Sequence, residues 1–69
     1  MKSQIVLFIY EKLLLKEEVS TNSLIGEFDI SIRTVRRYIA EINAYLLNFN
    51  KGKEVVFSKG KNTYILRNI

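Results

Sequence analysis

The sequence lacks the residue types on which many protein sites depend. Its 69 residues include no cysteine and no histidine. Without cysteine there is no disulfide framework and no thiolate site, which fits a reducing compartment. Without histidine, a metal site or an acid–base centre would have to rest on carboxylates and lysines, and no such cluster occurs along the chain. No nucleophile therefore has a base partner, and we expect neither an enzyme nor a cofactor.

Proline is also absent, and no repeat, low-complexity tract or linker divides the chain. We therefore expect one small domain over residues 1–69, which buries about 60% of its unfolded surface. The apolar run at residues 5–10 is interrupted by Glu11 and Lys12 and is far too short to span a bilayer. No small-residue cleavage site follows it, as a signal peptide would need. We expect a core helix here, no membrane contact and a cytoplasmic protein.

Positive charge is concentrated in the second half of the chain. The overall net charge is +4, but residues 1–30 carry −2 and residues 31–69 carry +6. Lysines that serve only solubility would be scattered more evenly. A scaffold half followed by a basic half is common among nucleic-acid-binding proteins.

Residues 31–47 carry the pattern of an amphipathic helix with its own start. Ser31 has a side-chain oxygen suited to N-capping, and Asp29 just ahead of it favours the positive end of a helix dipole. Apolar residues then recur at steps of three and four, forming one stripe: Ile32, Val35, Ile39, Ile42 and Leu46. The spacing predicts a helix that packs this stripe against a core.

The other side of this predicted helix is basic. Arg33, Thr34 and Arg37 lie opposite the stripe, and Arg36 flanks them. Such a helix suits the major groove of DNA, because arginine pairs with a guanine edge or a phosphate and a hydroxyl bonds a phosphate oxygen. The alternative is that the charges are only solvated, as on any surface helix. We expect Glu41 to pair with Arg37, four residues earlier.

The first predicted helix, residues 3–16 with Ser3 as a cap, is apolar on two sides. The side expected to face the core carries Ile5, Phe8, Ile9 and Leu13, with Val6 and Leu15 at its edges. A second stripe about 180° away consists of Leu7, Tyr10 and Leu14. A helix that is apolar on both sides is usually covered on both. We expect the later chain to cover this stripe, or a homodimer to form through it, or a C-terminal effector domain absent from this chain to dock there.

A polar connection at residues 17–20 leads to a short helix predicted at residues 21–28, capped by Ser20 or Thr21. Its apolar positions are Leu24, Ile25 and Phe28. Only Asp29 and Ile30 remain for the turn before the basic helix. Two helices joined by so short a turn form the helix-turn-helix arrangement.

Two β-prone runs, residues 54–58 and 63–66, surround a turn that contains Gly60, and they predict a hairpin within residues 54–67. We expect one face of each strand to cover the helices: Val55 with Phe57, and Tyr64 with Leu66. The tip presents Lys59 and Lys61. The predicted fold is mainly α with a small β-hairpin, a three-helix winged helix-turn-helix.

Residues 28–39, Phe-Asp-Ile-Ser-Ile-Arg-Thr-Val-Arg-Arg-Tyr-Ile, resemble the F-x-V-S-x-R-T-I-R-R-D-I signature of bacterial winged helix-turn-helix regulators. These include DeoR-type repressors, the N-terminal domains of WYL-type regulators, and domains of Mga-like and antiterminator-like activators. Gly60, Tyr64 and Leu66 are similar to their G-x-G-Y-x-L wing pattern. The chain departs from the families at Tyr38, which stands where they have aspartate, and in a wing that is two residues longer between glycine and tyrosine.

The resemblance implies DNA contacts from the first turns of the basic helix and from the wing. The residues at matching helix positions are Ser31, Arg33, Thr34, Arg36 and Arg37. We expect Arg33 and Arg37 to reach base edges, and the others, with Lys59 and Lys61, to hold phosphates or the adjacent minor groove. The predicted function is sequence-specific binding of double-stranded DNA by a transcriptional regulator.

Two other functions are alternatives to DNA binding. A winged-helix module that binds protein would use the Leu7, Tyr10 and Leu14 stripe, but it would have little use for three arginines on one outward face. RNA binding would favour a run of aromatic residues for base stacking, and the chain has none.

Overall fold

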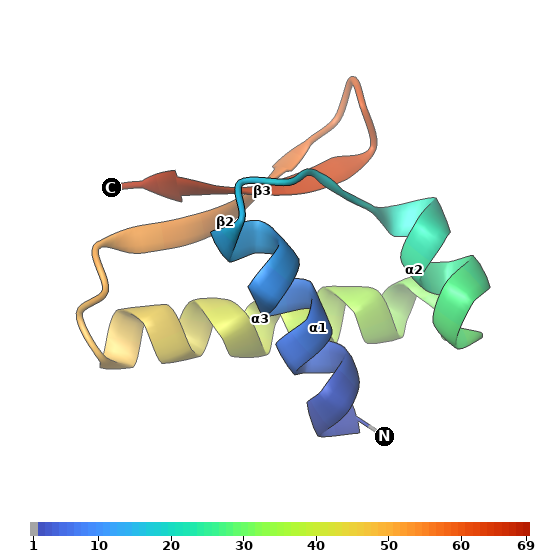
Figure 1. Ribbon diagram of the computed structural model, residues 1–69, viewed down its shortest axis with the longest axis horizontal. Helices are drawn as coiled ribbons and strands as arrows, with labels where there is room; N and C mark the ends of the chain where they lie inside the picture. Colours follow the sequence, from blue (N-terminus) through green and yellow to red (C-terminus); the bar gives the residue numbers. More distant parts are fainter. Residues whose placement is uncertain (1) are drawn as a thin grey trace.

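The computed structural model describes residues 2–69 as three helices and a three-stranded antiparallel sheet. The chain runs through α1 (Lys2–Leu14), β1 (Val19–Ser20), α2 (Thr21–Phe28), α3 (Ile32–Asn48), β2 (Lys53–Ser58) and β3 (Thr63–Asn68). The sheet order is β1-β3-β2. In Figure 1, α3 runs along one side of the molecule, the sheet lies over it, α1 crosses it, and α2 sits at its N-terminal end. This is the winged helix-turn-helix fold that the sequence predicts.

The helices end where the backbone turns left-handed. After α1, Lys16 has φ 63°, and the amide of Glu17 donates to the carbonyl of Lys12 at 3.1 Å. After α3, Asn50 has φ 50°, and the amide of Lys51 donates to the carbonyl of Leu46 at 3.0 Å. These six-residue closures satisfy carbonyls that a helix end leaves without partners.

The start and end of α1 differ from the prediction. The helix already includes Lys2, so Ser3 is not its cap, and it ends at Leu14 rather than near residue 16. Because Leu15 lies beyond that end, its side chain is exposed instead of bordering the core.

The core joins α1 and α3 to the sheet. Its buried hydrophobic residues come from all six elements and are Ile5, Ile9, Leu13, Val19, Leu24, Val35, Tyr38, Ile39, Ile42, Leu46, Val55 and Tyr64. Burying a side chain of this size contributes about 1.5–3 kcal/mol. The stripe predicted on α3 is therefore confirmed from Val35 onward. Ile32 remains 44% exposed because it is the first residue of the helix and lies outside the packed region.

One strand was not predicted. Val19 and Ser20, expected in a polar connection, form β1 and pair with Tyr64 and Thr63 of β3. On the other edge, Asn43 of α3 bonds both backbone groups of Val55: its Oδ1 accepts the amide at 2.8 Å and its Nδ2 donates to the carbonyl at 3.1 Å. The hairpin is thus held on both edges, by β1 and by α3.

Candidate nucleic-acid interface

The basic helix begins at a formed N-cap. Ser31 adopts an extended conformation, and its Oγ accepts a hydrogen bond from the amide of Thr34 at 3.1 Å. The hydroxyls of Ser31 and Thr34 also bond each other at 3.1 Å. The predicted cap is confirmed. It leaves the positive end of the α3 dipole at the surface, where anions bind favourably.

The turn before α3 is as short as predicted. Asp29 ends α2 with φ 53°, a left-handed conformation that aspartate tolerates better than most residues. Ile30 packs against the core. The turn therefore sets α2 against α3, and the two helices are in contact.

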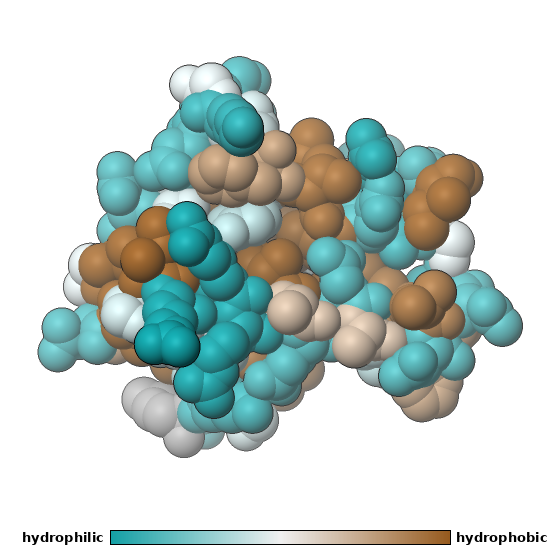
Figure 2. Space-filling view, turned by 180° about the vertical axis from the view of Figure 1, so that it is seen from behind, coloured by the Kyte–Doolittle hydropathy of each residue, from teal (hydrophilic) through white to brown (hydrophobic). Residues whose placement is uncertain are grey.

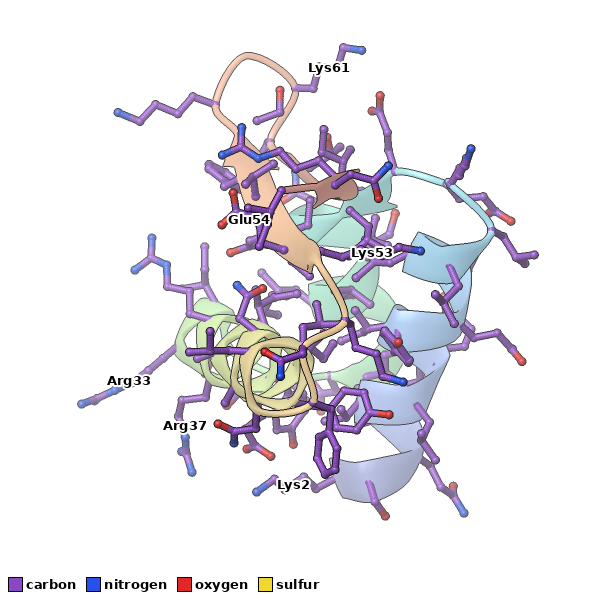
Figure 3. The ribbon with its side chains drawn as sticks, turned by 90° about the vertical axis from the view of Figure 1, so that its left-hand side faces the viewer. Lys2, Arg33, Arg37, Lys53, Glu54 and Lys61 are labelled. Carbon is purple, nitrogen blue, oxygen red and sulfur yellow. The ribbon has the colours of Figure 1, made fainter. Side chains whose placement is uncertain are left out.

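The three arginines of α3 extend into solvent. Arg33, Arg36 and Arg37 are all exposed, and none of them forms an ion pair with an acid among residues 2–69. Arg33 and Arg37 project from the helix toward the same side (Figure 3). Figure 2 shows a hydrophilic band over the first half of α3 and hydrophilic atoms at the tip of the hairpin.

Glu41 does not neutralise this surface in the expected way. The predicted pair with Arg37 is wrong, because the Glu41 carboxylate lies 2.9 Å from the Nζ of Lys2 on α1. The long side chain of Lys2 reaches α3 where the two helices cross. The pairing leaves Arg37 without the acid that its own helix could have supplied.

The hairpin and its turn, residues 53–68, form the wing. Its two tip lysines differ in their surroundings. Lys59 is exposed and forms no ion pair with residues 2–69, whereas the Nζ of Lys61 lies 3.1 Å from Glu18. The left-handed residue of the turn is Asn62, with φ 56°, and not Gly60.

One comparison with known proteins is decisive. A family model described as an HTH domain matches residues 6–64, most of the chain. This chain belongs to that family, a winged helix-turn-helix family found in bacterial regulators. Membership implies DNA binding, and the family is typically non-catalytic. No curated protein and no solved structure gave a significant match.

The departure at Tyr38 has a structural explanation in this HTH domain. Tyr38 is buried in the core between the exposed positions of Arg37 and Ala40. It therefore packs under the helix and contributes no charge to the outer surface. Tyr45, on the same helix, is 43% exposed.

The apolar stripe of the first helix, called here the α1 outer face, is only partly covered. Leu7 is 64% exposed and Leu14 is 47% exposed. Tyr10 makes an edge-to-face contact with Tyr45 of α3, with ring centroids 6.0 Å apart. A groove of about 390 Å³ lies beside it, between α1 and α3, lined by Val6, Leu7, Tyr10, Glu41, Ile42 and Tyr45. The later chain thus covers Tyr10 and leaves both leucines exposed.

Sequence reasoning missed two residues that shape the wing of the HTH domain, Asn43 and Glu18. Neither has a local pattern that distinguishes it, because their partners lie 12 and 43 residues away. Within residues 2–69, no helix is long and apolar enough to cross a membrane, and no group of three or more acidic side chains is placed to hold a metal ion.

Proposed function

We propose that this chain binds double-stranded DNA sequence-specifically, as a cytoplasmic bacterial transcriptional regulator or as the DNA-binding domain of one. The observation that carries the proposal is the outward face of α3. Three arginines occupy the first two turns of a capped helix, exposed and without acid partners among residues 2–69. Guanidinium groups in this position match guanine edges and phosphates.

The roles follow from position on α3. Arg33 and Arg37 extend to the same side and are the candidates for base edges in the major groove. Ser31 and Thr34 lie at the helix N-terminus, where backbone amides and hydroxyls bind phosphate oxygens. Arg36 flanks them as a further phosphate contact, and the basic tip of the wing, where Lys59 and Lys61 lie, faces the adjacent groove or backbone.

Buried residues fix the helix from behind. Val35 and Ile39 are buried on the core side of the turns that carry the arginines. A rigid support reduces the entropy lost when the arginines engage DNA, which favours specific recognition.

The test is fluorescence anisotropy on a random duplex pool and on a duplex selected from that pool, at about 50 and 200 mM salt. Wild type should prefer the selected duplex, and its affinity should fall steeply with salt. Arg37→Ala should lose about 1–3 kcal/mol of the preference, because a bidentate base contact is removed.

Arg67→Ala is the matched control, since this arginine lies on β3 and is paired with Glu54 at 2.6 Å. It should keep the preference. Salt-sensitive binding without preference would contradict sequence-specific recognition, and no binding at low salt would contradict the DNA function of the isolated chain.

A second candidate function is protein binding or dimerisation through the α1 outer face. The exposure of Leu7 and Leu14 beside an apolar groove favours it. Light scattering after gel filtration would test a homodimer. A dimeric wild type that Leu14→Glu converts to a monomer would support this role, whereas a variant that stays dimeric would remove the role of the face.

A further inference from the structure

The two tip lysines of the wing are held differently. The Nζ of Lys61 donates to Glu18 Oε2 at 3.1 Å, and the other carboxylate oxygen of Glu18 accepts a hydrogen bond from Thr63 Oγ1 at 3.3 Å. Lys59 has no comparable partner among residues 2–69. One carboxylate therefore joins the start of β1 to the end of the wing turn.

The backbone fixes Glu18 in this position. It directly precedes Val19 and Ser20, which pair with Tyr64 and Thr63 of β3. The amide of Thr21 also donates to the carbonyl of Asn62 at 3.2 Å. Because residues 19–21, which follow Glu18, are bonded to residues 62–64, Glu18 stays beside the wing turn.

An exposed ion pair alone holds a lysine weakly. The Lys61 side chain is 68% exposed and the Glu18 side chain is 44% exposed. Thr63 strengthens the arrangement, because its buried side chain limits the freedom of the carboxylate. In this conformation Lys61 points away from the side toward which Arg33 and Arg37 project (Figure 3).

We propose that Glu18 keeps Lys61 off the DNA, so that Lys59 is the phosphate contact of the wing. The inference rests on the proposed DNA-binding function and assigns Glu18 as a positioning residue. It acts through the direction of the Lys61 side chain and touches no DNA itself. The wing then contributes one phosphate contact where the sequence suggests two.

The experiment measures the slope of log affinity against log salt concentration for the selected duplex, because each phosphate contact contributes about 0.9 to that slope. Lys59→Ala should reduce the slope by about 0.9, and Lys61→Ala should leave it unchanged. Lys12→Ala is the control: this lysine also pairs with an acid, Glu17, but lies on α1. Thermal melting followed by circular dichroism verifies that each variant is folded.

Glu18→Gln removes the charge that holds Lys61 and should steepen the slope by up to about 0.9. Adding Lys61→Ala to Glu18→Gln should return the slope to the wild-type value. This double variant separates two causes of a steeper slope. A slope that is steeper because Lys61 is released returns to the wild-type value, whereas a slope that is steeper only because a negative charge is lost stays steep. Thr63→Val keeps the charge but removes the hydroxyl, and it should steepen the slope by less.

The results separate this inference from the function on which it rests. If wild type binds DNA and Lys61→Ala reduces the slope as much as Lys59→Ala does, Glu18 does not withhold Lys61 and only this inference is overturned. If the steeper slope of Glu18→Gln persists when Lys61→Ala is added, the inference is overturned as well. If wild type binds no duplex at low salt, both proposals fall.

Discussion

The two basic regions of the molecule, the start of α3 and the wing, carry similar charges in different electrostatic settings. On the wing, Lys61 lies beside Glu18, and Arg67 donates to Glu54 at 2.6 and 2.8 Å. On α3, no arginine has an acid partner among residues 2–69. Strand pairing explains part of the difference, because it places Glu54 directly opposite Arg67. A count of basic residues therefore overstates the positive charge that the wing can offer to DNA and understates the positive charge that α3 can offer.

Helical geometry explains the other part. The acids within helical reach of an arginine are Asp29, four residues before Arg33, and Glu41, four residues after Arg37. Asp29 lies outside the helix in the left-handed turn, and Glu41 pairs with Lys2. Neither acid pairs with an arginine of α3, so the arginines remain available to an anion of a binding partner.

The largest effect expected comes from removing the support behind these arginines. Ile39 is 6% exposed on the core side of α3, and Ile39→Ala should cost about 2–5 kcal/mol of folding free energy, a large fraction for so small a domain. Urea or thermal unfolding measures it. Leu47→Ala is the control, because Leu47 is on the same helix but 75% exposed, and it should change stability by less than about 0.5 kcal/mol. Equal effects would contradict the assignment of the two faces.

A smaller effect is expected at the start of the helix. Ser31→Ala should cost about 0.5–2 kcal/mol, since it removes the acceptor for the Thr34 amide. Ser31→Asp restores a cap of similar quality but brings a negative charge to the proposed phosphate contact. It should therefore fold with nearly wild-type stability while binding DNA more weakly. If Ser31→Asp binds as tightly as wild type, the start of α3 does not face a phosphate.

The smallest effect is expected on the wing. Glu54 and Arg67 are an exposed cross-strand pair, and their coupling in a double-mutant cycle with Glu54→Gln and Arg67→Gln should be about 1 kcal/mol or less. Thermal unfolding of the four proteins measures it. A coupling as large as the Ile39→Ala effect would mean that the wing depends on its ion pairs rather than on Asn43, β1 and the core.

Local sequence patterns predicted the elements that local chemistry determines. The Ser31 cap, the Val35 to Leu46 stripe and the short turn all depend on neighbours within a few residues, and all are present. The strand faces expected to cover the helices are confirmed at Val55, Tyr64 and Leu66, which are buried or pack against the core. Phe57 remains 44% exposed near the end of the strand, where the core does not reach.

Features that depend on distant contacts were not predictable. β1 has two residues and forms only because β3 lies beside it. The contacts of Asn43 with Val55 and of Glu18 with Lys61 require the tertiary fold first. The Lys2–Glu41 pair likewise depends on the crossing of α1 and α3. The DNA contacts themselves remain a prediction of the sequence. For the three arginines of α3, the structure adds their exposure and the absence of acid partners within residues 2–69.

The central claim is that DNA meets the arginine face of α3 and not the α1 outer face. The most direct test is to follow backbone amide chemical shifts by NMR while the selected duplex is added to isotopically labelled protein. The account predicts the largest shifts at residues 31–37, smaller shifts at residues 59–62, and little change at Leu7, Tyr10 and Leu14. Large shifts on the α1 outer face, with residues 31–37 unchanged, would contradict it.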